Sequence, residues 1–116
     1  MIDLTAFQQN CVLVIASSER QHGDIPHGLA VKEALEQIYG KEVNHGRLYP
    51  NLDALVDRGL VEKTERDKRT NAYSLTQKGA EAINDLQYFV RHAQGKDVAN
   101  PYGSEDTQAS TAPADD

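Results

Sequence analysis

Residues 45–79 have the sequence HGRLYPNLDALVDRGLVEKTERDKRTNAYSLTQKG. The first part has apolar residues at positions i, i+4, i+7 and i+8, which are Leu48, Leu52, Leu55 and Val56. This spacing places them on one stripe of a helix, which Gly59 is suited to end. The runs LVEKTER and NAYSL follow, and they contain β-branched and aromatic residues on either side of the polar tip DKRT. These features predict an antiparallel hairpin. A helix followed by a basic-tipped hairpin predicts a winged helix.

The same region resembles the PadR family of winged-helix transcriptional regulators. The resemblance rests on Leu48-Tyr49-Pro50, Leu52, Leu55, Gly59-Leu60, Tyr73, Leu75-Thr76 and Gly79. The acidic balance and the short C-terminal segment are similar to those of the haloarchaeal members. The resemblance implies a regulator that binds DNA and dimerises through its last helix. A large ligand-binding domain is not implied, because the region after the hairpin is short.

Two helices are expected before this region. The first covers residues 5–18, where Thr5 and Gln8 have capping-box spacing and an apolar stripe begins at Phe7. A polar turn with two glycines and one proline follows, and it has room for a short strand. The second helix covers residues 29–39 and is ended by Gly40.

The third helix is expected to begin between His45 and Leu48, with Asn44 as a candidate N-cap residue. Pro50 then has to lie near the first turn, because deeper in the helix it removes an internal hydrogen bond.

A last helix is expected over residues 76–93, with a helical face formed by Ala80, Ile83, either Leu86 or Gln87, and Val90. Such a helix has more apolar surface than one small core requires, so we expect it to dimerise. The expected dimer interface consists of Phe7, Cys11, Ile83, Leu86, Phe89 and Val90. Residues 95–116 are too polar and too rich in Gly, Pro, Ser and Asp to pack, and we expect an acidic, disordered tail.

The fold class predicted from these elements is α+β, mainly α. It is a winged helix-turn-helix with a two-stranded wing and a C-terminal dimerisation helix. Residues 1–94 form the DNA-binding domain, including both dimerisation helices.

The charge of the chain is unevenly distributed. The formal net charge of −6 argues at first against a nucleic-acid partner. However, residues 1–96 contain all 12 basic residues and 13 of the 18 acidic ones, so the acidity lies mainly in the tail. The densest basic segment is the tip between Arg66 and Asn71, and a local patch of this kind is sufficient for DNA contact. The acidic excess also fits a protein from a salt-rich cytoplasm.

Double-stranded DNA is the expected partner, and a homodimer the expected assembly. The candidate DNA-binding residues are Asn44, His45, Arg47, Tyr49, Asn51, Arg66, Lys68, Arg69 and Asn71. A helix fits the major groove, where Arg47 can pair with guanine and Asn51 with adenine. The basic tip can contact phosphates or enter a minor groove.

Several residues have plain structural interpretations. A tyrosine beside a leucine stripe is often a core residue, so Tyr49 is equally well explained by either role. Cys11 lies on an apolar stripe, where a buried thiol is the default and a redox sensor is the alternative. The four histidines match no metal-ligand spacing, and we expect neither a metal site nor any other cofactor.

No catalytic motif is present, so we do not expect an enzyme. No segment resembles a signal peptide or a membrane span, and we expect a cytoplasmic protein without a small-molecule effector. The predicted function is a sequence-specific transcriptional regulator with its third helix in the major groove and its wing on the backbone or minor groove. The alternative is a winged-helix interaction module that does not bind DNA.

Overall fold

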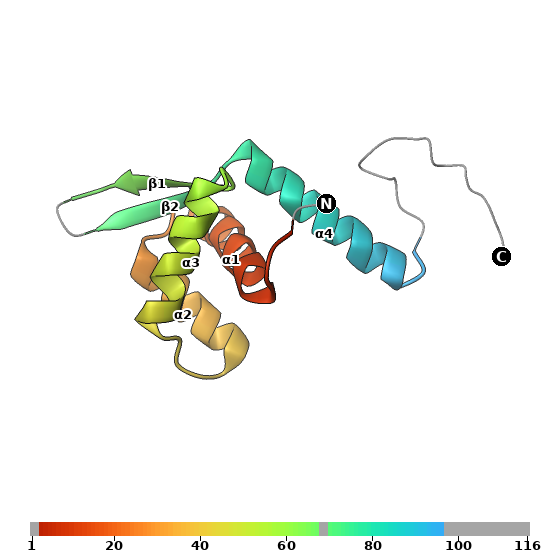
Figure 1. Ribbon diagram of the computed structural model, residues 1–116, viewed down its shortest axis with the longest axis horizontal. Coiled ribbons are helices and arrows are strands. Elements are labelled where there is room, and N and C mark those ends of the chain that lie inside the picture. The colour runs from red at the N-terminus through yellow and green to blue at the C-terminus, as the bar shows by residue number, and fades with distance from the viewer. Residues whose placement is uncertain (1–2, 68–69, 97–116) are drawn as a thin grey trace. The chain divides into compact units, whose positions relative to one another are not determined.

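The computed structural model describes residues 3–67 and 70–96. It contains the helices α1 (Ala6–His22), α2 (Gly28–Tyr39) and α3 (His45–Asp57), the strands β1 (Val61–Glu65) and β2 (Asn71–Leu75), and the helix α4 (Gln77–Ala93). Figure 1 shows this order along the chain. The prediction of a mainly α winged helix with a two-stranded wing is confirmed. Two compact units divide the chain, Met1–Ile83 and Asn84–Asp116, and the boundary between them falls within α4.

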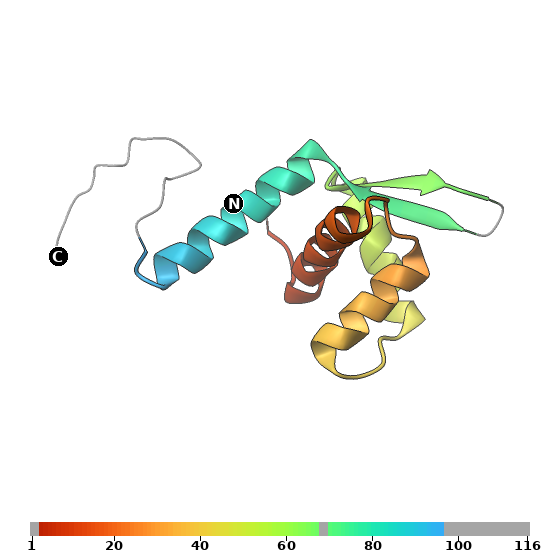
Figure 2. The same ribbon diagram turned by 180° about the vertical axis from the view of Figure 1, so that it is seen from behind.

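In the first unit, α1 packs against both α2 and α3, and it also contacts β2 (Figure 1, Figure 2). The start of α1 is capped as expected. The N–H of Gln8 donates to Thr5 Oγ1 over 3.1 Å, and the N–H of Thr5 donates to Gln8 Oε1 over 3.2 Å. One face of the helix is buried, comprising Phe7, Cys11, Val12, Val14 and Ile15.

The end of α1 was predicted four residues too early, because the helix continues to His22 instead of ending at residue 18. The polar residues after position 18 tolerate a helix, and Gly23 is the first position with a left-handed backbone, at φ 70°. The extra turn also has a tertiary role. The carboxylate of Glu19 accepts a 2.7 Å hydrogen bond from the N–H of Leu75 in β2.

The short strand expected in the turn before α2 is a single bridge between His27 and Ala72. Beside it, the N–H of Tyr73 donates to the carbonyl of Pro26 over 2.8 Å. These contacts tie the chain segment that enters α2 to the inner strand of the hairpin. They therefore fix where α2 begins relative to the wing.

The third helix begins as predicted, with Asn44 Oδ1 accepting from the N–H of Gly46 over 2.6 Å. Its stripe of Leu48, Leu52 and Leu55 is fully buried. The helix begins at His45, within the expected range, so Pro50 is its sixth residue and lies just beyond the first turn. The carbonyl of Gly46 therefore lacks its usual helical donor. Burial of the leucine stripe offsets this loss.

The hairpin pairs antiparallel, with Val61 opposite Leu75, Lys63 opposite Tyr73 and Glu65 opposite Asn71. Gly59 provides the left-handed turn after α3, at φ 78°. Leu60 and Val61 are then buried in the core, whereas the rest of β1 is exposed. The strand that faces inward is β2, through Ala72 and Tyr73.

The start of α4 lies close to the hairpin. Thr76 Oγ1 donates to the carbonyl of Gly59 over 2.6 Å and accepts from the N–H of Gly79 over 3.0 Å. A Cβ atom added to Gly79 would overlap the carbonyl oxygen of Leu60. This close approach places Gly79 toward the core and leaves Ala80 exposed, so the apolar face expected at Ala80 was wrong at its first position.

The second unit contains the last part of α4, where Tyr88 contacts the rings of Phe89 and His92. Residues 97–116, which include nearly all of the expected tail, lie outside the described residues. Among the residues that are described, no helix is long and apolar enough to cross a membrane.

Candidate nucleic-acid interface

The surface of α3 that faces away from its buried leucine stripe is exposed along the length of the helix. The exposed positions are His45, Gly46, Arg47, Pro50, Asp53 and Asp57. The predicted contact residues in α3 divide between two sides of this surface. Arg47 and Asn51 lie one turn apart on the side of α1, whereas His45 and Tyr49 lie one turn apart on the other side. Asp53, which was not among the predicted contacts, follows Tyr49 and pairs with Lys63 of the wing.

Arg47 is held over an aromatic platform. Its guanidinium carbon lies 4.0 Å from the centroid of the Phe7 ring and 6.0 Å from that of Tyr39. Phe7 and Tyr39 themselves stack, with centroids 6.1 Å apart. A guanidinium that stacks on a ring keeps the N–H groups at its edge available. Arg47 is therefore restrained in position and still able to donate hydrogen bonds.

Asn51 has both ends of its side-chain amide engaged. Its Nδ2 donates to the carbonyl of Arg47 over 2.7 Å, and its Oδ1 accepts from Gln8 Nε2 over 3.0 Å. The second bond joins α3 to α1. In this arrangement Asn51 holds α3 in place against α1, and a bidentate contact with adenine would require Gln8 to release the oxygen.

Asn44 and His45 also differ in whether the side chain is engaged within the protein or accessible at the surface. The side chain of Asn44 is used as the N-cap of α3. The ring of His45 is exposed and stacks on Tyr49, with centroids 5.7 Å apart. Tyr49 is half-buried, and a Cβ atom added to Gly28 would lie 2.7 Å from its hydroxyl. Tyr49 thus packs against the start of α2 while it remains on the accessible side of α3.

At the wing, Arg66 forms an ion pair with Asp24, with 2.9 Å between Nη2 and Oδ1. The hydrogen bond from Arg66 is the main cause that lowers the pKa of Asp24. Both side chains are exposed, so solvent weakens this pair. Asn71 is half-buried at the base of the hairpin. Lys68 and Arg69, also predicted to contact DNA, lie outside the described residues.

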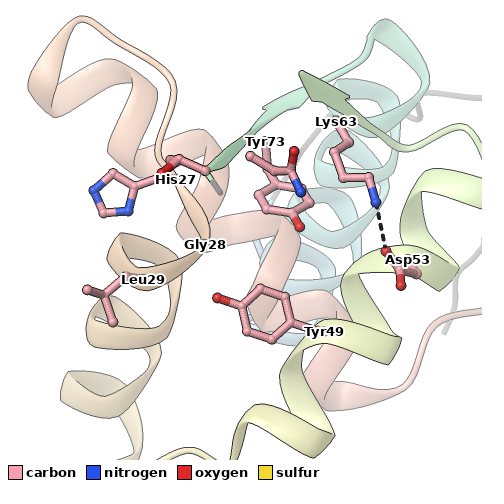
Figure 3. A pocket seen from close by; sticks show the side chains of 9 residues that line it. His27, Gly28, Leu29, Tyr49, Asp53, Lys63 and Tyr73 are labelled. Carbon is pink, nitrogen blue, oxygen red and sulfur yellow. Dashed lines mark hydrogen bonds and ion pairs between the residues drawn. The ribbon is translucent and has the colours of Figure 1, made fainter. Parts of the chain in front are cut away.

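A pocket of about 450 Å³ lies between the start of α2, the middle of α3 and the wing (Figure 3). It is lined by His27, Gly28, Leu29, Tyr49, Asp53, Lys63, Thr70, Asn71 and Tyr73. Lys63 Nζ lies 3.3 Å from Asp53 Oδ1, and this pair spans from the wing to α3. Sequence analysis found Tyr49 and Asn71 but missed Lys63 and Tyr73. Their alternation in the hairpin was the available signal, because residues paired across two strands share a face.

The residues expected at a dimer interface are placed very differently from one another. Phe7 and Cys11 are only 4% and 0% exposed and pack inside the core of their own chain, and Ile83 packs against that core. Leu86 is half-buried. Phe89 and Val90 are 44% and 57% exposed. Only these last two offer substantial apolar surface to a partner.

The burial of Cys11 also bears on redox chemistry. Desolvation raises the pKa of its thiol to about 12, although the nearby charge of Arg47 acts in the opposite direction. Since the thiolate is the reactive form, a thiol of this kind is inert at neutral pH. The structure therefore favours the plain interpretation of Cys11 as a small core residue.

Comparison with protein families and solved structures shows which proteins this chain resembles. Residues 13–85 match the transcriptional regulator PadR-like family. No curated protein sequence matches the chain. Among solved structures, RosR from H. salinarum, grown from NaBr, is 50% identical with a TM-score of 0.73, over 83% of this chain and 82% of that one. The hsRosR-S1 complex is 52% identical with a TM-score of 0.71, over 78% and 76% of the two chains.

A more distant structure shares only the fold. F93 from STIV, a winged-helix DNA-binding protein, is 18% identical with a TM-score of 0.58, over 77% of this chain and 92% of that one. The family match covers more than half of the chain, and the similarity to RosR extends over three quarters of it. The chain therefore belongs to the PadR-like family of winged-helix transcriptional regulators, which bind DNA and are not enzymes.

Proposed function

We propose that the chain acts as a homodimer that recognises a specific DNA sequence with α3 in the major groove and the β1–β2 wing on the backbone or minor groove. The observation that carries this proposal is the position of Arg47. It lies at the N-terminal half of α3, exposed, and supported from below by the ring of Phe7. The N-terminal half of a recognition helix is the part that reaches base edges.

The proposed DNA contacts are of two kinds: some read the bases, and others hold the protein in position on the duplex. Arg47 is the candidate for a bidentate contact with guanine, with His45 and Tyr49 beside it on α3. Asn51 contributes chiefly by holding α3 against α1, through its bond to Gln8. Arg66, Lys68, Arg69 and Asn71 on the wing contribute phosphate or minor-groove contacts. A regulator of this kind has to reach the chromosome, so we propose a cytoplasmic location.

The dimer is proposed to form through α4. Phe89 and Val90 are exposed there, next to Tyr88. Large apolar side chains that remain exposed on a helix gain stability when another surface buries them. Two copies related by a two-fold axis would present two α3 helices to half-sites about one helical turn of DNA apart.

The test is selection of bound fragments from fragmented genomic DNA, followed by affinity measurements on the selected duplex. Arg47→Ala should weaken binding by roughly 1 to 3 kcal/mol and relax preference at one base position in each half-site. Arg20→Ala, which removes the same charge from the exposed end of α1, is the matched control and should preserve that preference. An interaction module that does not bind DNA predicts no enrichment at all. Equal weakening by Arg47→Ala on every sequence would assign Arg47 to the backbone.

A further inference from the structure

The hydroxyl of Tyr73 is a polar group that the fold leaves unexplained. Tyr73 is only 2% exposed. Within residues 3–67 and 70–96, no hydrogen bond satisfies its hydroxyl. Figure 3 shows the ring and its oxygen directed into the pocket between α2 and α3. Buried hydroxyl groups normally have a partner, and leaving one unpaired costs stability. The hydroxyl is therefore placed to form a hydrogen bond with a group that enters the pocket.

The backbone holds Tyr73 next to the start of α2. The 2.8 Å hydrogen bond from its N–H to the carbonyl of Pro26, and the bridge between His27 and Ala72, join β2 to the segment that enters this helix. On the other side, the hydroxyl of Tyr49 packs directly against Gly28 in the first turn. Two phenols, from β2 and from α3, thus converge on one helix N-terminus.

The groups around this space are mostly donors. The two phenols, the ammonium of Lys63 and the amide of Asn71 line it, and Gly28 and Leu29 bring the positive end of the α2 dipole to its edge. Burial is the main cause that raises the pKa of Tyr73, so its hydroxyl stays protonated near neutral pH. The lining contains one carboxylate, Asp53, which Lys63 already pairs with at 3.3 Å. A group that is all acceptor, such as an oxyanion, complements these donors.

We propose that this pocket seats one backbone phosphodiester of bound DNA, which accepts hydrogen bonds from the Tyr73 and Tyr49 hydroxyls and draws Lys63 away from Asp53. This inference rests on the proposed DNA binding and adds a phosphate site to it. A duplex phosphate is favoured over a free anion because the pocket is bordered by α3 and the wing, the two elements proposed to face the DNA. The site clamps the duplex between the start of α2 and the hairpin.

The first test is Tyr73→Phe, measured on the duplex selected from genomic fragments. Removing the hydroxyl should weaken binding about tenfold, as expected for a hydrogen bond to a charged group. The thermal unfolding midpoint should stay the same or rise, because the hydroxyl that is lost has no hydrogen-bond partner among the residues that the structure describes. Ser17→Ala, which removes a hydroxyl from an exposed position of α1 outside the proposed DNA and dimer surfaces, is the control and should leave affinity unchanged. Equal affinity of wild type and Tyr73→Phe would overturn the inference.

The second test locates the phosphate. Neutral methylphosphonate replaces each phosphate of the duplex in turn. At one position in each half-site, the replacement should weaken binding of the wild type more than binding of Tyr73→Phe, because the variant has already lost one of the contacts to that phosphate while Tyr49 and Lys63 remain. If every position weakens both proteins equally, no single phosphate occupies the pocket and the inference is wrong.

The outcomes separate this inference from the proposed function. If the wild type enriches no duplex, DNA binding fails and the phosphate site fails with it. If the wild type binds a specific duplex and Tyr73→Phe binds it equally well, only the phosphate site fails. Titration with inorganic phosphate, followed by the NMR signals of the Tyr73 ring, completes the set. Saturable shifts together with unchanged DNA affinity in Tyr73→Phe would assign the pocket to a free anion instead.

Discussion

The role of a single residue in this chain depends on the side chains that it packs against. Arg47 and Cys11 illustrate this, because both lie close to the first turns of α1. The ring of Phe7 supports the guanidinium of Arg47. Cys11, one turn further along α1, is fully buried. The first turns of α1 therefore support an exposed cation of α3 and bury a thiol of their own. The sequence pattern alone showed only an apolar stripe there.

The buried thiol makes a prediction about pH. Burial raises the pKa of Cys11 from 9.0 to about 12, so the folded state holds its proton more tightly than the unfolded state does. The contribution of Cys11 to stability is thus fully present below pH 9 and is lost as the pH rises from about 9 to about 12. We expect the free energy of unfolding of the wild type to fall by about 1 kcal/mol more between pH 8 and pH 10 than that of Cys11→Ala. Urea denaturation at both pH values measures this difference. Parallel losses in the two proteins would mean that Cys11 is accessible to water.

At the level of elements, the sequence predicted what local signals determine. The leucine spacing of α3, the N-cap at Asn44 and the capping box at Thr5 all follow from neighbours in the chain, and each is confirmed. The end of α1 and the buried face of α4 were misplaced. The buried face of α4 depends on Gly79 approaching Leu60, a contact between residues far apart in the sequence. The end of α1 is set by Gly23, and the additional turn brings Glu19 to Leu75 of β2.

The candidate site was predicted in part for the same reason. Residues of α3 and the wing tip are visible as a helix surface and a charge cluster. The pocket depends on the segment before α2 being joined to β2 by Tyr73 and Pro26, a contact that no periodicity reveals. Asn51 was predicted to contact bases, and its bond to Gln8 could not be read from the sequence because it joins two helices.

The contact between α4 and the hairpin can be tested at Gly79. A Cβ at this position would overlap the Leu60 carbonyl and lie 2.6 Å from Leu75 Cδ1. Alanine favours a helix over glycine by about 1 kcal/mol, so an open site would be stabilised by the change. We expect the opposite: Gly79→Ala should destabilise the protein by about 1 to 3 kcal/mol, because backbone and core have to shift. Chemical denaturation gives the sign, and a stabilised variant would show that α4 is not packed this closely.

At the level of the whole molecule, the dimer that we propose depends on the exposed apolar residues of α4. Replacing both Phe89 and Val90 by Ala should raise the dimer dissociation constant, because the two side chains lose the surface that a partner would bury. Ile38→Ala is the matched control, since Ile38 is 56% exposed on α2 and is not proposed to contact the partner. Sedimentation equilibrium over a concentration series measures the constants. An unchanged constant for the double variant would move the dimer interface elsewhere.

The uneven charge of the chain makes a further prediction about DNA binding. Residues 97–116 contain five acidic residues and no basic ones, so their removal changes the formal net charge from −6 to −1. A negative net charge opposes approach to the DNA backbone at long range, and salt screens this repulsion within about 10 Å at 0.1 M. Truncation after Lys96 should therefore strengthen binding to unrelated DNA at low salt, and the gain should disappear as salt is added. Affinity for the selected duplex should increase by the same factor or less, because its base contacts are unchanged. Fluorescence anisotropy across a salt series measures both affinities. A full-length variant with the five acids replaced by Asn or Gln separates charge from length, and it should behave like the truncated chain. If that variant behaves like the wild type while truncation still strengthens binding, the effect of the tail is steric and the electrostatic argument is wrong.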